Sequence, residues 1–388
     1  MSSRIVLAIG GNSLIRAKDR SSFADQLGTA AETCRHIADL VAAGHEVVVT
    51  HGNGPQVGFL LIRSHLSRTR LPEIPLDACN AETQAEIGYM IQQSLANEFA
   101  SRGLNHHDTD EPQRHREHGD TGKALLTTQN PKSKIQNGLG GVVTVVTQVV
   151  VDRNDPAFKN PSKPVGPFYT KAEAVGLQKE LGWTMREDAG RGFRRMVASP
   201  RPVEVVELPA IERLVEQGMV VIACGGGGIP VVKEGTKAEG RSQKAEGRSE
   251  EAEGARLRGV AAVIDKDLAS SLLARLIGAD TLVISTAVEQ VYVDYGKPNQ
   301  RPLADVRISE MREYLRAGQF PEGSMGPKVE AALEFLEADE GRRQKSEARS
   351  QNGGAETTGG GRQRLVVITD PEHIGEAMRG EAGTRISK

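Results

Sequence analysis

Residues 219–277 of this 388-residue sequence combine glycine, lysine and carboxylate side chains in an order that could bind an anion. An apolar, β-branched run at 219–224 leads into four glycines, and such a run is typical of a strand buried on both faces. Lys266 then stands between two aspartates, just before leucines that recur at helical spacing. We expect Asp267 to cap this helix. Because a helix N-terminus beside a lysine binds phosphate well, the stretch predicts a phosphate site.

A plainer interpretation is a flexible glycine loop with a solvent-exposed lysine. It is weakened by two further glycine clusters, Gly-Gly-Asn at 10–12 and Gly-Asn at 52–53, because each also follows a strand-like run. Neither has the spacing of the GxxxxGK[ST] or GxGxxG phosphate loops. In an open parallel sheet, ligands bind outside the carboxyl ends of the strands, so we expect these clusters to face one site.

A second lysine occupies a position that an anionic ligand would explain. Lys328 follows a glycine-containing turn at 323–327 and comes at the start of an expected helix, 329–336. The positive end of the helix dipole disfavours a cation there unless a negative ligand shares the site. Backbone amides at strand ends together with lysines could position and neutralise a phosphoryl group.

The expected elements alternate between strands and helices, which predicts an α/β fold built on a mainly parallel sheet. Strands are expected at 4–9, 46–50, 142–151, 219–224, 281–286, 290–295 and 365–369. Helices are expected at 30–43, 82–99, 268–277, 329–336 and 371–378. The apolar stripe of the helix at 82–99 indicates core or a subunit interface. The proline-punctuated segment 153–167 predicts a rigid excursion from the sheet, which we place within a small protruding subdomain or lid at 152–200 of a single domain spanning 1–388.

The overall composition argues against several functions. The net charge of −2 gives no electrostatic footprint for nucleic acid or a membrane surface. The three scattered cysteines, Cys34, Cys79 and Cys224, form neither a disulfide framework nor a metal-binding spacing, so we expect a reducing cytoplasm. No signal peptide or membrane span is evident.

Three polar segments do not fit the α/β pattern and account for a hydrophobic content of only 38%. They lie at 105–140, 234–258 and 339–362, and the second contains a near-repeat of seven residues without apolar positions. We expect all three to be disordered insertions, because they cannot bury enough apolar surface to offset their ordering entropy. The first contains four histidines, but its glycine- and glutamine-rich setting offers no scaffold, so we predict no metal site.

The ordered set of motifs resembles the amino-acid kinase family and, within it, the carbamate kinases. The resemblance covers nearly the whole chain outside the three insertions, and the order of the motifs is more specific than any one of them. Those motifs include AIGGN (8–12), THGNGPQVG (50–58), EDAGRGFRRMVASPRP (187–202), ACGGGGIPVV (223–232), VAAVIDKDLAS (260–270), VYVDYGKPNQ (291–300) and GSMGPKVEAALEF (323–335).

This resemblance implies a three-layer αβα sandwich, a homodimer and reversible phosphoryl transfer between ATP and carbamate, with Mg²⁺ accompanying the nucleotide. It also implies roles for individual residues. The phosphates and the small acid would be bound by Gly10, Gly11, Asn12, Gly52, Asn53, Gly226 and Gly227. The catalytic residues would be Lys163, which reaches the acid, Lys266 and Lys328, which neutralise phosphates, and Asp267, which orients the lysines. The nucleotide would contact Lys266, Thr286, Tyr292, Met325 and Lys328.

Two features refine the resemblance. Acetylglutamate kinase-like members carry a lysine two residues before the first Gly-Gly, where this chain has Ala8, which argues against an amino-acid γ-carboxylate substrate. The segment Thr286 to Glu289 departs from the pattern of many relatives, which affects the expected details of base binding. His51 is the one histidine within a glycine motif, and we expect it to be a structural hydrogen-bonding residue.

Other functions remain open from the sequence. A kinase of another small acid would use the same fold. A catalytically inactive protein that binds carbamoyl phosphate or nucleotide would be favoured by loss of a key lysine or of Gly-Gly-Asn, but all are present. The insertions could also make the chain a scaffold for partners.

Overall fold

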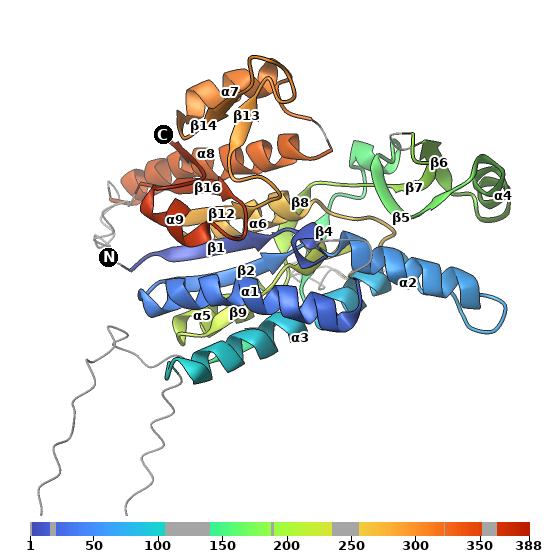
Figure 1. Ribbon diagram of the computed structural model, residues 1–388, viewed down its shortest axis with the longest axis horizontal. Coiled ribbons are helices and arrows are strands. Elements are labelled where there is room, and N and C mark those ends of the chain that lie inside the picture. The colour runs from blue at the N-terminus through green and yellow to red at the C-terminus, as the bar shows by residue number, and fades with distance from the viewer. Residues whose placement is uncertain are drawn as a thin grey trace, which may run out of the picture.

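A central eight-stranded sheet organises the molecule (Figure 1). The computed structural model describes residues 2–15, 21–104, 140–187, 190–234, 256–321, 323–350 and 363–388. The strand order is β15-β17-β16-β12-β1-β2-β9-β3, and within this sheet only the β16–β17 pair is antiparallel among the described residues. The bounds are β1 Arg4–Ile9, β2 Glu46–His51, β3 Val142–Thr144, β9 Val220–Ile222, β12 Thr281–Ser285, β15 Asp305–Arg307, β16 Leu365–Thr369 and β17 Thr384–Ser387.

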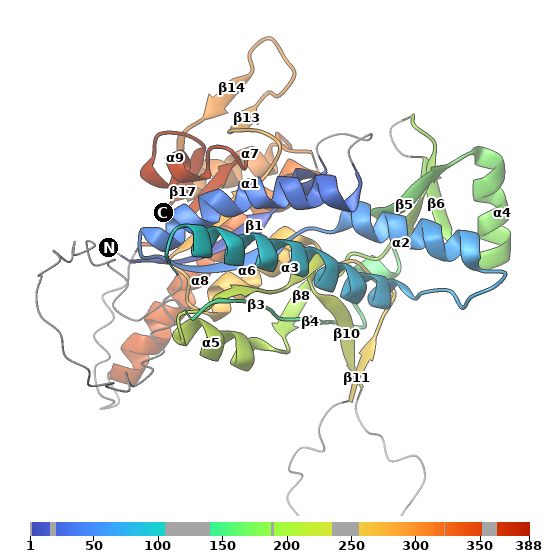
Figure 2. The same cartoon turned by 60° about the horizontal axis from the view of Figure 1, so that its bottom comes forward.

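Helices cover both faces of this sheet, because its strands are apolar on both sides. In β1, Ile5 and Leu7 face one core while Val6 faces the other. The first core is closed by α1 (Phe23–Ala42), α3 (Leu76–Ser101) and α9 (Ile374–Arg379), with α1 and α3 side by side in Figure 2. The second is closed by α5 (Leu208–Glu216), α6 (Lys266–Leu276), α7 (Ile308–Arg316) and α8 (Met325–Ser350). The predicted three-layer αβα arrangement is therefore confirmed.

A second sheet of four strands has the order β11-β10-β4-β8. Its strands are β4 Gln148–Val151, β8 Pro202–Val205, β10 Ile229–Glu234 and β11 Arg256–Gly259. The prediction of one strand over residues 142–151 is thus wrong, since β3 and β4 belong to different sheets. Polar contacts explain the break: the Thr147 amide donates to Gln84 Oε1 at 2.8 Å, and its hydroxyl accepts from the Cys224 amide at 3.0 Å.

The predicted insertions are shorter than expected where the structure describes their ends. Glu234 ends β10, and residues 256–258 belong to β11, which pairs with β10 in an antiparallel hairpin. Residues 339–350 continue α8 rather than starting a separate segment. The remaining parts of the three predicted insertions, and the histidines of the first, lie outside the described residues.

A small group of elements projects from the main body beside α2 (Figure 1). It contains a three-stranded sheet in the order β5-β7-β6 and helix α4. The bounds are α2 Gly54–Ser67, β5 Lys163–Tyr169, α4 Lys171–Leu181, β6 Thr184–Glu187 and β7 Phe193–Val197. Val165 and Val197 of this projection pack with Val57 and Leu61 of α2, which joins it to the body.

The remaining described elements are short. A hairpin is formed by β13 (Val291–Val293) and β14 (Arg301–Leu303). Three 3-10 turns are η1 Gly11–Leu14, η2 Pro156–Phe158 and η3 Gly225–Gly227. Across the described ranges, no helix combines the length and apolar character needed to cross a membrane.

Candidate active site

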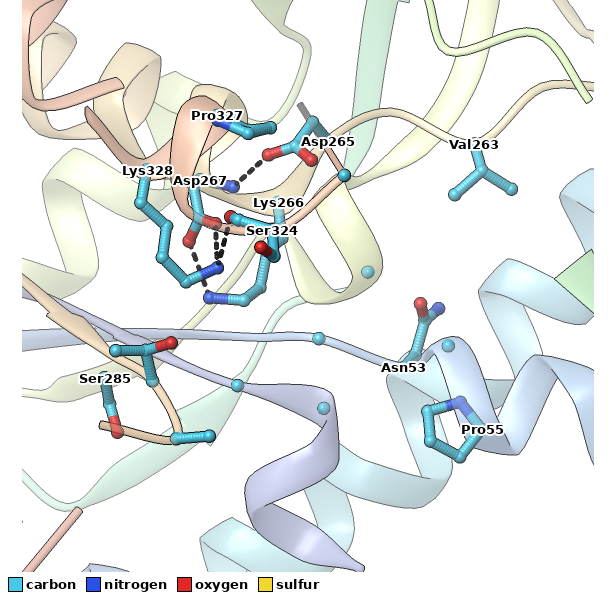
Figure 3. Close-up of a pocket in the computed structure, with 18 of the residues that line it drawn as sticks. Asn53, Pro55, Val263, Asp265, Lys266, Asp267, Ser285, Ser324, Pro327 and Lys328 are labelled. Carbon is cyan, nitrogen blue, oxygen red and sulfur yellow. Dashed lines mark hydrogen bonds and ion pairs between the residues drawn. The ribbon is translucent and has the colours of Figure 1, made fainter. Parts of the chain in front are cut away.

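One cavity of about 620 Å³ opens at the carboxyl ends of β1, β2, β12 and β16. The glycine clusters after β1 and β2 reach it together, as the parallel-sheet argument predicts. Its other walls come from η3, the α6 N-terminus, the α8 N-terminus and β5. Figure 3 labels the residues at the starts of α6 and α8. The residues that line it are Gly10, Gly11, Gly52, Asn53, Gly54, Pro55, Lys163, Gly226, Val263, Ile264, Asp265, Lys266, Asp267, Ser285, Thr286, Ala287, Gly323, Ser324, Pro327, Lys328, Asp370, Pro371 and Glu372.

Three cationic side chains converge on this cavity, each beside a carboxylate. Lys266 Nζ lies 2.6 Å from Asp267 Oδ1, and Lys328 Nζ lies 3.1 Å from Asp267 Oδ2. Lys163, which begins β5 of the projection, places its Nζ 2.8 Å from Asp265 Oδ2. Three lysines separated by up to 165 residues of chain therefore share one site with two aspartates, as Figure 3 shows for the α6 and α8 pair.

Asp267 is buried, with only 2% of its surface exposed, and bridges two ammonium groups. Burial alone would raise the pKa of its carboxyl, but the charges and hydrogen bonds of Lys266 and Lys328 outweigh burial and lower the pKa to about 2. Burial lowers the pKa of Lys266, and the Lys328 charge adds to this although Asp267 opposes it. The two lysines and one carboxylate carry a net positive charge, which suits a phosphate ligand.

The prediction that Asp267 caps α6 is wrong, because Asp265 is the N-cap. Asp265 Oδ1 accepts a hydrogen bond from the Asp267 amide at 2.9 Å and a longer one from Leu268 at 3.5 Å. Asp267 is the second residue of the helix, in its first turn, and its side chain faces the lysines instead of capping the helix. The sequence signal for Asp265 was the first aspartate of the Asp-Lys-Asp turn, since an N-cap precedes the first helical residue.

The glycines of the first two clusters allow their loops to touch. A Cβ on Gly52 would lie 2.6 Å from the Gly11 nitrogen and 3.2 Å from Cδ of Lys266. The Gly52 amide also donates to the Ile9 carbonyl at 2.9 Å. Any side chain at Gly52 would separate the two loops, so their backbone amides can approach a common ligand only with glycine there.

The third glycine cluster, residues 225–228, is buried and packs closely against neighbouring residues. Gly226 has φ +64°, and a Cβ there would lie 2.1 Å from Asn53 Nδ2. Gly227 is buried and does not line the cavity, so it supports the loop behind Gly226. The interpretation as a loose loop with a solvated lysine is therefore wrong for the described structure.

His51 lies beneath these loops as a buried neutral side chain. Its Nδ1 is 3.2 Å from the Gly52 carbonyl oxygen. Burial lowers its pKa to about 4, and the nearby Lys266 charge contributes in the same direction. A histidine that is neutral at ordinary pH and faces the backbone agrees with the structural role expected from the sequence.

Some expected site residues do not reach the cavity. Thr286 lines it, but Tyr292 and Met325 do not. Tyr292 lies on the β13–β14 hairpin with its ring 6.0 Å from that of Tyr295, and Met325 packs against the second core. Gly11, which begins η1, lines the cavity, and Asn12 follows it in the same turn.

Sequence reasoning missed one wall of the cavity and two supporting side chains. The loop Asp370 to Glu372 follows β16, so the rule that ligands lie beyond strand ends could have located it. Asn80 and Thr83 hold Asn53 from α3, and no pattern in the sequence pairs them with it. Within the described residues, no cluster of three or more histidine, cysteine, aspartate or glutamate side chains could hold a metal ion.

A strand-end cavity with glycine loops and paired lysines, on a three-layer αβα fold, is the architecture of a phosphoryl-transfer protein. The family model described as "Amino acid kinase family" matches residues 3–343, and the chain belongs to that family.

Within this family, the chain is similar to proteins named carbamate kinase or carbamate kinase-like. The chain is 40% identical over 388 residues to "Carbamate kinase" of Clostridium perfringens, covering 99% of this chain and 100% of the relative. It is 41% identical over 391 residues to "Carbamate kinase-like protein YahI" of Escherichia coli, covering 100% of both. The solved carbamate kinase of Giardia lamblia bound to AMP-PNP superimposes with a TM-score of 0.75 at 35% identity, covering 100% of this chain and 99% of that one.

Proposed function

We propose that this protein is a carbamate kinase, which transfers a phosphoryl group reversibly between ATP and carbamate. The observation that carries the proposal is the convergence of Lys163, Lys266 and Lys328 with two glycine loops on one strand-end cavity. The full-length similarity to proteins named carbamate kinase supports the same acid as substrate.

The chemistry requires little from the protein beyond positioning and charge compensation. In the direction of ATP synthesis, an oxygen of the ADP β-phosphate attacks the phosphorus of carbamoyl phosphate, and the bond from phosphorus to the carbamate oxygen breaks. Neither partner needs a proton removed, because the attacking oxygen and the leaving carbamate are anionic. The absence of a histidine base among the described cavity residues agrees with that requirement.

We assign the residues by their places around the cavity. Lys266 and Lys328 bind the phosphates, and Asp267 orients both ammonium groups. Gly10 and Gly11, with the neighbouring Asn12, border the transferred phosphoryl group. Gly52, Asn53 and Lys163 border the acid, while Gly226 supports Asn53 from behind and Gly227 supports that loop.

ATP and ADP are the proposed nucleotides, in keeping with the AMP-PNP bound by the Giardia relative. Thr286 would lie next to the nucleotide, whereas Tyr292 and Met325 would need to move to contact its base. Mg²⁺ would be held chiefly by the nucleotide phosphates, which is its usual mode in kinases, since the described residues offer no metal-ligand cluster.

ATP formation from ADP, Mg²⁺ and carbamoyl phosphate tests this function. We expect ATP from the native protein and almost none from Lys266→Ala. A folded protein that binds ADP but makes no ATP would point to another acid. A protein that neither makes ATP nor binds nucleotide would contradict the assignment of the cavity.

A second candidate, a kinase of another small acid on this fold, is favoured by the E. coli relative named only carbamate kinase-like. Measuring ADP formation from ATP with a panel of small carboxylic acids separates the two. A carboxylic acid that outperforms carbamate under the same conditions would make this candidate the function.

We also propose a cytoplasmic homodimer. Strand β3 ends the described sheet, and beside it Tyr89 and Val146 expose about half of their surfaces, 52% and 48%. The Phe23 ring stacks on the Tyr89 ring, with the two ring centroids 6.2 Å apart. A second copy covering these apolar side chains would also protect the β3 edge. Light scattering should give twice the chain mass for the native protein and the single-chain mass for Tyr89→Glu; an unchanged mass would place the interface elsewhere.

A further inference from the structure

The side chain of Asn53 has only one polar atom left for a ligand. Asn53 follows β2 and lines the cavity, and Figure 3 shows its amide projecting into the space between its own loop and the Asp265–Asp267 turn. Its Nδ2 donates to Asn80 Oδ1 and to Thr83 Oγ1, the latter at 2.8 Å. Both hydrogens of this NH₂ group are therefore used by α3.

The direction of the first hydrogen bond is fixed by the backbone. Asn80 Nδ2 donates to the Gly228 carbonyl oxygen at 2.5 Å, and a carbonyl oxygen can only accept. The Asn80 amide therefore cannot be turned around without placing two oxygens against each other. Its Oδ1 must face Asn53, so the group that Asn53 presents to it must be the NH₂.

The second hydrogen bond has the same direction for an independent reason. The Thr83 hydroxyl has one proton, and the carbonyl oxygens of Cys79 and Asn80 both lie 2.9 Å from Oγ1. With its proton committed to the helix backbone, Thr83 Oγ1 can only accept from Asn53. All three side chains are buried, so no orientation with unpaired groups would be tolerated.

The Asn53 amide oxygen, Oδ1, is consequently the atom that remains available to a ligand. Among the described residues, no group donates a hydrogen bond to Asn53 Oδ1, although the side chain lines the cavity. An amide oxygen with a fixed orientation is a hydrogen-bond acceptor and cannot act as a donor. A ligand beside it must supply an N–H or O–H, because an apolar group there would leave the oxygen unpaired.

We propose that Asn53 Oδ1 selects an acid that carries an N–H donor next to its carboxyl group, and that Asn80 and Thr83 are the positioning residues that fix this polarity. The inference rests on the proposed function and deepens it. Carbamate and carbamoyl phosphate carry such an NH₂ group. Acetate and acetyl phosphate carry a methyl group of similar size in the same place, so they match the shape of the site without its hydrogen bond.

The size of the discrimination follows from the unpaired acceptor. Sites built to hydrogen-bond a substrate N–H or O–H reject analogues that lack it by factors far above the ~10- to 200-fold that a single methylene provides. We expect carbamoyl phosphate to exceed acetyl phosphate in kcat/KM by at least about 10³-fold, with ADP as the common acceptor.

The experiment measures the ratio of kcat/KM for these two phosphoryl donors in the native protein and in Asn53→Ala, Asn80→Leu and Thr83→Val. We expect the ratio to fall at least tenfold in the first two and severalfold in Thr83→Val, mainly through KM for carbamoyl phosphate. The matched control is Gln92→Leu, an α3 amide whose oxygen accepts from the Thr144 backbone at 3.0 Å outside the cavity; its ratio should not change.

A purely structural role would lower the rate with both donors equally and leave the ratio intact. That result in all three variants would overturn the inference, as would a native protein that uses both donors equally well. ATP from neither donor would overturn the proposed function and the inference together. Thr83→Val is nearly isosteric, so it keeps the test decisive if the asparagine variants do not fold.

Discussion

At the scale of single residues, the site depends on one buried carboxylate that two ammonium groups share. The Asp267 carboxyl stays ionised, because its pKa is low and each of its two oxygens contacts a different lysine. Removing one lysine leaves the other still paired. We therefore expect lysine variants to lose phosphate binding while they keep the fold.

Lys266→Ala and Lys328→Ala should each lower kcat/KM for ATP formation by about 10²- to 10³-fold, the range seen when one preorganised charge-stabilising donor is removed. Circular dichroism and thermal melting report whether the fold persists. Lys233→Ala, which breaks a surface ion pair with Glu204, is the matched control and should keep native activity. Native turnover in either site variant would contradict the phosphate assignment.

His51 makes stability depend on pH in a defined direction. The unfolded side chain takes up a proton below about pH 6.5, whereas the folded one does so only near pH 4. Between these values the unfolded state binds more protons, so this contribution is complete above pH 6.5 and is lost as pH falls towards 4. At about 1.4 kcal/mol per pH unit, the loss reaches about 3 kcal/mol.

Chemical denaturation at pH 7.5 and pH 5.0 measures this effect. His51→Gln should lose much less stability than the native protein between the two pH values. His36→Gln on α1 serves as the histidine control and should keep the native pH dependence. An unaltered dependence in His51→Gln would mean that other groups cause it.

At the scale of elements, the N-terminus of α6 joins the projection to the phosphate site. Asp265 uses one oxygen to cap α6 and the other to hold Lys163 of β5. The same side chain therefore fixes where the helix begins and where the lysine of the projection lies. These two tasks can be separated, because asparagine caps helices about as well as aspartate but carries no charge.

Asp265→Asn should raise KM for carbamoyl phosphate about tenfold, equal to about 1.4 kcal/mol, while its melting temperature stays near the native value. Asp265→Ala should show the same KM and also lose about 1 kcal/mol of stability with the cap. Glu204→Gln, which neutralises the partner of Lys233, is the charge control. Equal melting temperatures for the alanine and asparagine variants would show that the cap contributes nothing.

Strand ends were the part of the site that the sequence predicted best. The expected strand at 365–369 coincides with β16, and the expected first two strands agree with β1 and β2 to within one residue. These strands are buried on both faces, so their apolar runs are unambiguous. Glycines at their ends were informative because the loops approach too closely for any side chain.

Elements whose boundaries depend on distant partners could not be predicted in this way. The division between β3 and β4 is made by Gln84 and Cys224, which contact Thr147 from other parts of the chain. Helix α2 was not predicted; it starts at Gly54 and Pro55 inside a glycine motif. The orientation of Asn53 likewise depends on Asn80, 27 residues away, through a contact that only folding creates.

At the scale of the whole molecule, the catalytic cavity and the β10–β11 hairpin are built from different elements. No residue of β10 or β11 lines the cavity, and the hairpin projects away from the main body in Figure 2. The segment that joins the two strands, residues 235–255, lies outside the described residues. Because the two strands that this segment joins do not line the cavity, we expect its removal to leave the cavity unchanged.

Deleting residues 237–250 should leave kcat and KM within about twofold of the native values, since surface changes away from structural features have small effects. The measurement is ATP formation alongside a thermal melt. A deletion variant that melts normally but is inactive would show that the segment belongs to the site.

The pairing at the tip of this hairpin has a practical use in protein engineering. Glu234 and Arg256 are cross-strand partners, so whatever chain connects them begins and ends at neighbouring points. The entropic cost of a longer connection grows only slowly with its length. A folded reporter whose own termini are adjacent, such as a fluorescent domain, could be grafted between these two residues and would report on the enzyme while it turns over.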